Sequence, residues 1–524
     1  MTALLEAGAP APTPVAHLAP SFDAADARAS IFRTWPFALG LFYLLSGSFF
    51  VNAHVLIGDA LSRTATARMV VAGADPHFGA LGWVWGPLPT LLEVPLVSLG
   101  GLAPWLVKDG YAGVIVSAVF GAWAAWHLFR LLVERGTGGS WSAIITAGFA
   151  LNPFVIIFSG NGMSEAIYLC FLLGAVRHLS RFQQSARPSA LALAGLYLGL
   201  DCLVRFESLA AAVGAMVFIS VVSWQRGTAG AVRERLRSIL VKCLIIGFPV
   251  AFCFILFVGF SWWLTDQALA QYSSLYGQSA QIVGTGLATF ANVRVPQVAV
   301  ELLALSPALA VVLPLALWRS LRGRGSVFPC AACVLGPALL FDVESLSTGG
   351  LFNLMRYLIL IIPLTVIALV TVAGRGRMVK TFAVATIALS FAGAWWITGN
   401  RSDASQEYAY HQAVLGHSAE SMADLQLGGA RAVTAWLDAQ SSGSSSILLD
   451  TYDGFEILAE TDHPGRYVIP ADQDYQQILE APYQHGVRYL VTIPPAGPGA
   501  LYILNRYYPG LFEGCLTNTQ LVLT

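Results

Sequence analysis

Residues 58–63 read Gly-Asp-Ala-Leu-Ser-Arg, and residues 85–95 read Trp-Gly-Pro-Leu-Pro-Thr-Leu-Leu-Glu-Val-Pro. The two motifs bound a polar and amphipathic stretch that separates long hydrophobic segments. Asp59 follows the first long apolar run directly, so we expect it where a membrane helix ends and a first external loop begins. This stretch therefore predicts where the membrane-embedded part of the chain opens to an aqueous face.

The composition indicates a polytopic membrane protein. Of 524 residues, 56% are hydrophobic and only 11% are charged, whereas about 25% is usual for soluble proteins. The formal net charge of -1 and the lack of a basic stripe outside short loops argue against a nucleic-acid partner. Six of the seven cysteines lie in apolar runs and are expected to pack as small hydrophobic residues.

The hydrophobic runs predict about eleven transmembrane helices, the first over residues 33–55 and the last over residues 379–398. Residues 1–30 are rich in Ala and Pro and predict a disordered cytoplasmic tail. We expect a transmembrane domain over residues 31–399. Within it, residues 58–107 form the first external loop, whose prolines favour interfacial helices over another crossing.

The distribution of basic residues predicts how the chain is oriented across the membrane. Arginine and lysine gather in alternate loops between the predicted spans, and the positive-inside rule makes these loops cytoplasmic. The opposite loops are then external, and they hold most acidic residues of this region: Asp59, Asp75, Glu93, Glu165, Glu207, Asp266, Glu301, Asp342 and Glu344. We therefore expect a plasma-membrane protein, of bacterial type, with a polar external face.

Residues 400–524 have the composition of an extracytoplasmic α/β domain long enough for its own core. Helices alternate there with short apolar strands, expected at residues 447–449, 467–469, 489–493 and 521–523. We interpret this domain as a packing or recognition module without a catalytic role.

Asp59, Glu165, Arg205, Glu207 and Arg356 all fall at external ends of predicted spans. Ionisable residues at membrane depth are costly to bury and are candidates for function by default. The alternative is that each one caps a helix or extends its charged end to the interface.

This arrangement resembles the GT-C superfamily of polytopic glycosyltransferases over most of residues 33–373. Gly58-Asp59-Ala60 resembles the acidic site after the first helix, and Trp85-Gly86-Pro87-Leu88-Pro89 is similar to the Pro-Pro-Leu motif of protein O-mannosyltransferases and lipid A aminoarabinose transferases. Glu165 matches a carboxylate after the third helix. Arg205-Phe206-Glu207 resembles the basic turn after the fifth, and Asn353-Leu354-Met355-Arg356-Tyr357 is similar to a late Arg-Tyr motif.

Two departures limit what can be transferred. Ala60 follows Asp59, so the Asp-Glu pair of protein O-mannosyltransferases is absent, and Gly86 replaces the first proline of the later motif. The tandem acidic motif of oligosaccharyltransferases is absent too. Neither family's substrate therefore carries over.

The resemblance implies inverting transfer of a sugar from a polyprenyl-phosphate donor, held in the membrane lipid, to a hydroxyl of a glycan, lipid or protein. A carboxylate suits such a reaction because the attacking hydroxyl must lose its proton, which makes Asp59 the predicted general base. Fixed cations stabilise the charge that grows on the leaving phosphate. Arg205 and Arg356 are the predicted phosphate-binding residues.

Asp75, His77, Glu165 and Glu207 are further candidates for contacts with substrate or with a divalent cation; no cofactor is certain. Asp-Pro is also a common start of a turn, which is the alternative reading of Asp75-Pro76-His77. Asp472-Gln473-Asp474 has the Asp-x-Asp form of metal-dependent nucleotide-sugar transferases, but an acidic residue before a soluble helix is ordinary, and we assigned it no metal.

Two other function classes compete. A transporter or flippase of lipid-linked sugar would show a weak internal repeat and ionisable residues near the middle of the membrane. Neither feature is clear, because the polar residues gather at the external ends. A scaffold that binds partners through residues 400–524 would leave the polar cluster unexplained.

Overall fold

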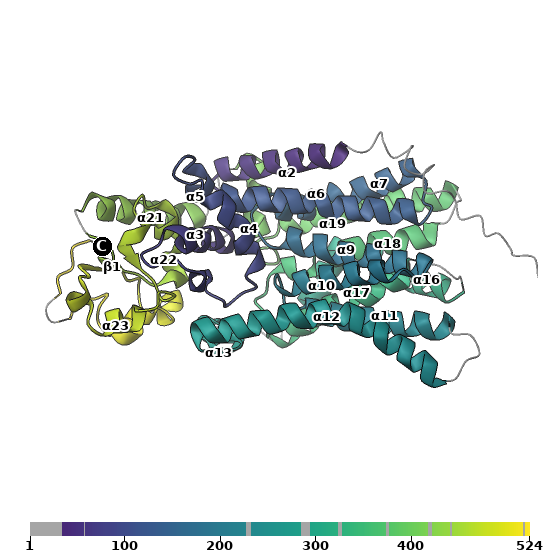
Figure 1. Ribbon diagram of the computed structural model, residues 1–524. Coiled ribbons are helices and arrows are strands. Elements are labelled where there is room, and N and C mark those ends of the chain that lie inside the picture. The colour runs from purple at the N-terminus through teal and green to yellow at the C-terminus, as the bar shows by residue number, and fades with distance from the viewer. Residues whose placement is uncertain are drawn as a thin grey trace, which may run out of the picture.

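In the computed structural model the long helices run side by side, and the C-terminal domain lies at one end of them (Figure 1). The structure describes residues 34–56, 58–226, 232–284, 294–322, 327–373, 377–417, 422–440, 443–516 and 519–523. The predicted tail, residues 1–30, lies outside these ranges, as do parts of the basic loops.

Seven described helices are long and apolar enough to cross a membrane, or up to nine if each of two bent pairs is one span. The chain is therefore an integral membrane protein. The unbroken candidates are α2 (Trp35–Asn52), α6 (Tyr111–Glu134), α11 (Ser208–Arg226), α12 (Val232–Thr265), α17 (Phe328–Thr348), Met355–Val372, which contains η4 (Met355–Leu358) and most of α18 (Ile361–Ala373), and α19 (Arg377–Thr398).

The two bent pairs are each broken near a proline. Helices α7 (Gly139–Ala150) and α8 (Pro153–Gly160) meet at 69°. The Asn152 side chain accepts a hydrogen bond from the Phe154 N–H at 3.0 Å and so caps α8, while Pro153 has no N–H with which to continue α7. Helices α15 (Arg294–Leu305) and α16 (Leu309–Arg322) meet at 71° around Pro307.

Two more helices lie within the bundle, α9 (Glu165–Ser185) and α10 (Pro188–Cys202). Nearly every residue of α9 is buried, so this helix forms the centre of the bundle. The predicted first external loop contains α3 (Gly58–Ala72), η2 (Phe78–Leu81), α4 (Leu88–Val97) and α5 (Trp105–Lys108).

The C-terminal region contains a parallel sheet in the order β2-β1-β3, built from β1 (Ile447–Leu448), β2 (Tyr467–Val468) and β3 (Tyr489–Leu490). Residues 521–523 are described but form no strand, so the fourth predicted strand is wrong; they are exposed and pair with no neighbour in the described sheet. The helices of this region are α20 (Glu407–Val414), α21 (Met422–Ala439), α22 (Thr451–Glu460), η5 (Pro464–Arg466), α23 (Tyr475–Glu480), η6 (Pro482–His485), η7 (Gly497–Ala500) and α24 (Ile503–Tyr507).

Helix α20 packs with the membrane helices. The Tyr410 and Phe50 rings meet edge to face at 4.7 Å between centroids. Tyr410 and Ala413 are both buried in the large apolar core that the membrane helices share. This part of the chain is therefore joined to the bundle by a continuous hydrophobic core.

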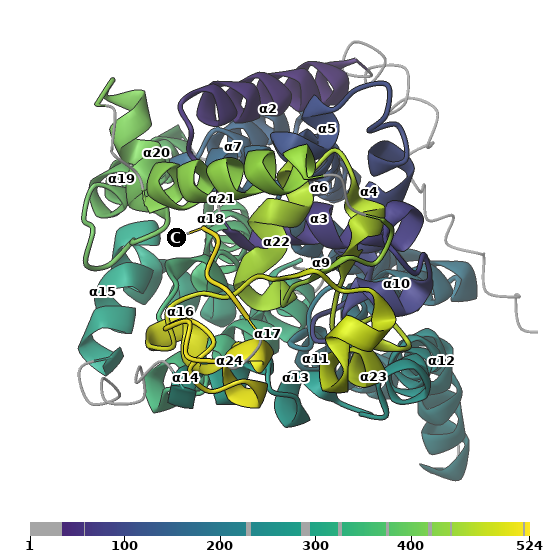
Figure 2. The same ribbon diagram turned by 90° about the vertical axis from the view of Figure 1, so that its left-hand side faces the viewer.

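Helix α22 joins the C-terminal domain to the predicted first external loop by lying against α3 (Figure 2). A Cβ on Gly58, where α3 begins, would lie 3.3 Å from the Phe455 ring, so the two helices approach closely there. The Arg68 guanidinium donates from Nη1 to the carbonyl oxygens of Leu458, Ala459 and Thr461 at 3.1, 3.2 and 2.7 Å. These carbonyls end α22, where a cation is favourable.

Replacing Arg68 with Ala is expected to lower the free energy of opening the end of α22 by about 1.5–3 kcal/mol, because hydrogen bonds from a charged group are lost. The matched control is Arg431→Ala, since Arg431 pairs with Glu460 of the same helix at 2.8 Å but is 45% exposed; exposed pairs are worth under about 1 kcal/mol. Hydrogen exchange of the α22 amides measures the difference. Equal protection in both variants would contradict this role for Arg68.

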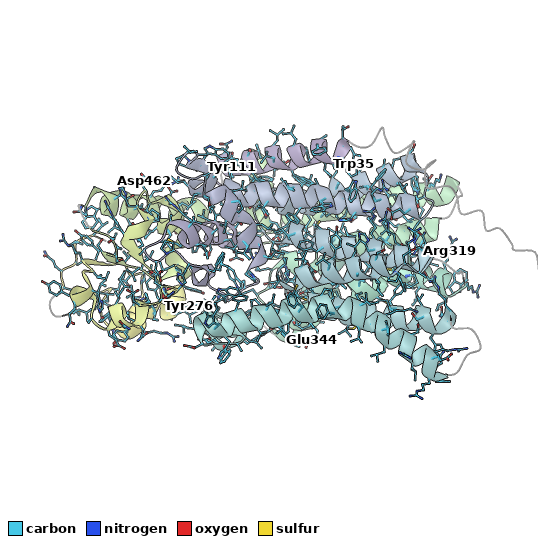
Figure 3. All side chains as sticks on the ribbon, in the orientation of Figure 1. Trp35, Tyr111, Tyr276, Arg319, Glu344 and Asp462 are labelled. Atoms are coloured by element: carbon cyan, nitrogen blue, oxygen red, sulfur yellow. The ribbon has the colours of Figure 1, made fainter. Side chains whose placement is uncertain are left out.

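Labelled side chains distinguish the two ends of the bundle. Tyr276 and Asp462 lie at the end that carries the C-terminal domain, and Arg319 lies at the far end (Figure 3). The segment between α12 and α15 contains α13 (Ala270–Ser273) and α14 (Gln278–Gly284), with residues 285–293 outside the described ranges. The Tyr276 hydroxyl donates to Asp450 Oδ2 at 2.9 Å, so this loop is fastened to the C-terminal domain.

Candidate active site

Helix α3 carries Asp59 and Arg63 on one face, because residues four apart lie one above the other on a helix. Asp59 occupies the first turn, where the positive end of the helix dipole favours a carboxylate. The same helix buries Ala60, Ala65 and Ala67, whose small side chains allow close packing. Asp59 therefore has a fixed place at the end of the bundle nearest the C-terminal domain.

Arg356 meets Asp59 across 297 residues of sequence. It lies in the single turn η4 before α18, and its Nη2 donates to Asp59 Oδ2 at 2.7 Å. Its Nε lies 3.6 Å from Glu165 Oε1. Arg356 thus connects Asp59 of α3 to Glu165, the acid that begins α9.

Glu165 is set in place by the tight turn between α8 and α9. Gly162 has a φ of +80°, which glycine adopts without strain. Its N–H donates to the Ser117 hydroxyl at 3.1 Å, and the Asn161 side chain accepts from the Met163 N–H at 3.0 Å. The carboxylate that follows is 1% exposed.

Arg205 is enclosed by two carboxylates and two rings. Its Nη1 donates to Glu165 Oε1 at 3.2 Å and its Nη2 to Glu207 Oε1 at 2.9 Å. The guanidinium also lies 5.1 Å from the centroid of Tyr168 and 4.8 Å from that of Tyr357. With its side chain only 9% exposed, Arg205 is held within the protein.

The turn that carries Arg205 also holds the Trp85–Pro89 motif. The Leu88 N–H donates to the Leu203 carbonyl at 3.0 Å. A Cβ on Gly86 would come within 2.4 Å of the same carbonyl oxygen. The glycine that departs from the Pro-Pro-Leu pattern is therefore required here by the close approach of two backbones.

Arg63 was not among the predicted site residues, yet it faces the same cluster. Its Nη2 lies 3.5 Å from the Ser164 hydroxyl and its guanidinium 5.6 Å from the centroid of the Trp85 ring. Within the part of the chain that the structure describes, no carboxylate forms an ion pair with Arg63. Its spacing of four from Asp59 was the signal in the sequence.

Charge and exposure differ among these acids. The Asp59 side chain is 31% exposed, whereas those of Glu165 and Glu207 are 1% and 8% exposed. Burial alone would raise the pKa of Asp59, but the charges of Arg356 and Arg63 hold it below its usual range. Asp59 is therefore the most accessible of these three carboxylates, and Arg356 holds it in place.

The Arg205–Glu207 pair is mutually stabilised. Burial alone would lower the pKa of Arg205, but the charges of Glu207, Asp342 and Glu165 raise it well above its ordinary value. Burial alone would raise the pKa of Glu207, but the Arg205 charge lowers it. Both groups stay charged at neutral pH.

Glu93 lies beside this cluster as a neutral acid. It is 1% exposed, and its Oε2 accepts a hydrogen bond from the Thr64 hydroxyl at 2.6 Å. Burial raises its pKa to about 8, against the smaller opposing effects of Thr64 and Arg63. Glu93 therefore carries a proton at pH 7.

Glu93→Gln is expected to keep activity and to change how stability depends on pH. An unfolded glutamate releases its proton near pH 4.3, whereas folded Glu93 keeps it to about pH 8. The folded state binds the extra proton between these values, so this group makes wild-type stability fall as pH rises from about 4.3 to about 8. The free energy of unfolding, measured at pH 5 and at pH 8, should therefore fall less in the Glu93→Gln variant than in the wild type. An unchanged pH slope would show that Glu93 is ionised in the folded protein.

Asp75 and His77 do not join the contacts of Asp59, Glu165 and the arginines. They lie after α3 and before η2, and their side chains gather with Asp472 of the C-terminal domain. The predicted metal set of Asp75, His77 and Glu165 is thus not brought together. The structure places Asp75 and His77 with Asp472, which the sequence predicts only as an ordinary acid before a soluble helix.

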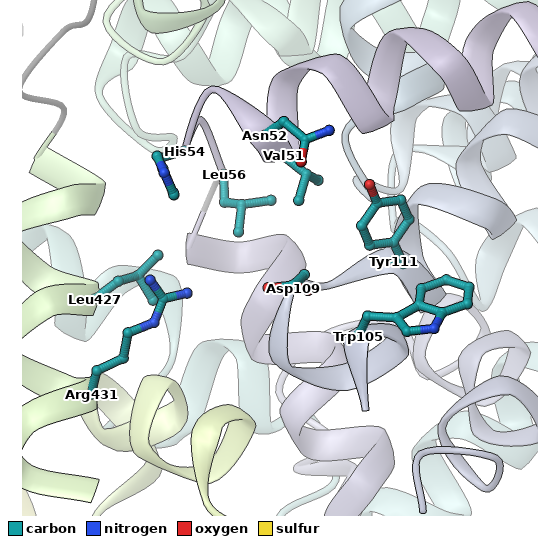
Figure 4. Close-up of a pocket in the computed structure, with 9 residues that line it drawn as sticks. All are labelled: Val51, Asn52, His54, Leu56, Trp105, Asp109, Tyr111, Leu427 and Arg431. Carbon is teal, nitrogen blue, oxygen red and sulfur yellow. The ribbon is translucent and has the colours of Figure 1, made fainter. Parts of the chain in front are cut away.

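A cavity of about 540 Å³ opens between the end of α2, the start of α6 and α21 (Figure 4). Trp105, Tyr111 and Arg431 line it. None of its lining residues belongs to the Asp59 cluster, so we do not identify it with the reaction site.

Comparison with known proteins finds similar structures but no similar sequences. No family model matches the sequence. No curated protein matches it either.

The fold is similar to that of ArnT from Cupriavidus metallidurans bound to undecaprenyl phosphate, with a TM-score of 0.51 and 14% identity, over 88% of this chain and 90% of that chain. For ArnT from the same organism in the apo state, the TM-score is 0.48 and the sequence identity is 13%, over 88% of this chain and 89% of that chain. At this identity the likeness shows the fold alone. The predicted resemblance to the GT-C superfamily is confirmed at that level.

Proposed function

We propose, from the fold shared with ArnT, that this protein is an inverting membrane glycosyltransferase. It moves a sugar from a polyprenyl-phosphate donor to a hydroxyl acceptor at the outer face of the membrane. The observation that carries the proposal is Asp59, an accessible carboxylate held at 2.7 Å by Arg356 within a buried set of arginines and acids.

Asp59 acts as the general base in this reaction. The acceptor hydroxyl attacks the anomeric carbon, the bond from that carbon to the phosphate oxygen breaks, and Asp59 takes the hydroxyl proton. Arg356 holds one carboxylate oxygen, Oδ2. The exposed part of the side chain faces the acceptor.

Arg63 and Arg356 stabilise the departing phosphate, whose negative charge increases as the bond breaks. Arg63 suits this role because it lies on the Asp59 face of α3 and has no carboxylate partner among the described residues. Arg205 was predicted to bind phosphate as well. Because two carboxylates enclose it, we assign it the role of positioning Glu165, which in turn contacts Arg356.

The proposed topology places the reaction outside. The nine candidate spans together with α9 and α10 make eleven. The basic loops, with Arg319 at the far end of the bundle, are then cytoplasmic by the positive-inside rule. The Asp59 cluster and the C-terminal domain both lie on the external side.

The test uses purified full-length protein in nanodiscs, with undecaprenyl-phosphate hexoses as donors and cell-envelope glycans and lipids as acceptors. Mass spectrometry should detect hexose on an acceptor and an equal amount of free undecaprenyl phosphate. Movement of the donor between leaflets without release of phosphate would instead favour the flippase. No turnover of any donor across the panel would count against the proposal.

Arg63→Ala is expected to weaken binding of undecaprenyl phosphate about 10- to 100-fold, since a charge-assisted hydrogen bond is worth about 1.5–3 kcal/mol. Arg63→Lys should recover part of the affinity. Arg401→Ala is the matched control, because Arg401 is exposed and lies beyond the last membrane helix. Equal affinity of the Arg63→Ala and Arg401→Ala variants would remove Arg63 from the phosphate site.

A further inference from the structure

Asp75, His77 and Asp472 converge where the first external loop meets the C-terminal domain. One ligand atom from each side chain lies within 4.8 Å of the other two. Asp75 and His77 flank Pro76 after α3, and Asp472 lies in the turn between β2 and α23. Nearly 400 residues of chain separate the two parts of this cluster.

The two carboxylates come together without a lysine or arginine among the described residues, and His77 Nδ1 lies 3.6 Å from Asp75 Oδ2. Asp472 is 6% exposed, and the Asp75 side chain is 38% exposed. Among the described residues, neither forms an ion pair with lysine or arginine. Two acids at this separation, one of them buried, are unfavourable unless a positive group joins them.

One ring nitrogen of His77 lies beside the two carboxylates, and the backbone holds the imidazole in place. Its Nδ1 lies 2.7 Å from the Asp75 carbonyl oxygen and donates its proton there, which leaves the lone pair on Nε2. Ligating histidines commonly donate their other ring N–H to a carbonyl in this way. The Nε2 edge of the ring packs against Gly79, where a Cβ would come within 2.4 Å of it, so a larger residue at that position would displace the ring.

The carboxylate of Asp472 is equally fixed. Its Oδ2 accepts from the Ile469 N–H at 2.9 Å, and the Asp472 N–H donates back to the Ile469 carbonyl at 2.9 Å. Asp75 Oδ2 also accepts from the Gln473 N–H at 3.3 Å. These bonds hold the two acids in contact across the junction between domain and loop.

We propose that Asp75, His77 and Asp472 form a divalent transition-metal site that fastens the C-terminal domain to the first external loop. One imidazole and two carboxylates are ligands that Zn²⁺ accepts, with water in a fourth position. Tetrahedral ligands at 2.0–2.2 Å from Zn²⁺ lie about 3.3–3.6 Å apart. Side-chain shifts of about 1 Å therefore close the site.

The site has a structural consequence and does not depend on the proposed transfer reaction. The domain that carries Asp472 also carries α22, which lies across the start of α3 where Asp59 is located. A metal at the junction would hold α22 over that end of the helix. The metal acts on the attachment of the domain and takes no part in proton transfer.

The test measures bound metal in the full-length protein in detergent, stripped with EDTA, reloaded with Zn²⁺ and desalted. Mass spectrometry of the metal should find about one Zn²⁺ per chain in the wild type. Asp472→Asn and His77→Gln should each weaken Zn²⁺ binding at least about tenfold, since even the loss of an outer contact costs 10- to 100-fold. Asp474→Asn is the matched control, because Asp474 belongs to the same Asp-x-Asp motif but is exposed and outside the cluster.

Two further readouts separate metal binding from misfolding. Co²⁺ bound to the wild type should show visible d–d absorption that the His77→Gln and Asp75→Asn variants lack. Limited proteolysis should release the C-terminal domain faster after EDTA treatment of the wild type, and Zn²⁺ should reverse this. Wild-type protein without stoichiometric Zn²⁺, or equal binding by the Asp472→Asn and Asp474→Asn variants, would overturn the proposal.

Discussion

Replacing Asp59 with Asn is expected to lower kcat by about 10²- to 10⁴-fold, the range that a positioned general base contributes. The amide keeps the size of the carboxylate and can still accept from Arg356, but it cannot take the acceptor proton. Turnover is measured as release of undecaprenyl phosphate. The matched control is Asp266→Asn, since Asp266 is an exposed acid directly after α12.

The kinetic pattern separates catalysis from positioning. Loss of a base lowers kcat and leaves the KM for donor nearly unchanged, whereas loss of an anchor for Arg356 raises that KM. Because the pKa of Asp59 is held below its usual value, wild-type activity should fall only as pH drops below about 4. An Asp59→Asn variant that turns over like the Asp266→Asn variant would exclude the general-base role.

Replacing Arg205 with Ala is expected to destabilise the folded protein by about 3–5 kcal/mol. That is the cost of removing one partner of a buried ion pair. Glu165 and Glu207 would remain buried without their shared cation. Unfolding in SDS measures the change, with Arg187→Ala as the control because Arg187 is exposed in the turn between α9 and α10.

A second variant distinguishes structural charge balance from phosphate binding. Adding Glu207→Gln to Arg205→Ala should restore part of the lost stability, because one unpaired charge is removed. If Arg205→Ala instead unfolds like Arg187→Ala and only loses affinity for undecaprenyl phosphate, Arg205 belongs to the phosphate site. The stability of Arg205→Lys should lie between those of the wild type and Arg205→Ala, since one ammonium group cannot match the planar guanidinium that contacts both acids.

Local properties of the chain determined the broad architecture. A membrane helix needs only a run of apolar residues, so hydropathy predicted a polytopic helical protein. The motifs around Asp59, Trp85 and Arg356 were sufficient to indicate a GT-C-like fold. Alternating apolar segments likewise located the three strands of the C-terminal sheet. The strand expected at residues 521–523 is wrong because an apolar triplet forms a strand only where a neighbouring edge is available to pair with it.

Contacts between distant residues were decided by the tertiary structure. The sequence placed Asp59, Glu165, Arg205 and Arg356 at external helix ends, but only packing shows that one oxygen of Glu165 faces two arginines. Arg63 shares a helix face with Asp59, yet its lack of a carboxylate partner among the described residues depends on where α9 and η4 lie. The sequence predicts Asp472 only as an ordinary acid before a soluble helix, whereas the fold brings it beside His77. Hydropathy and charge are summed along the chain, whereas an ion pair depends on a few ångströms between segments that only the folded core brings together.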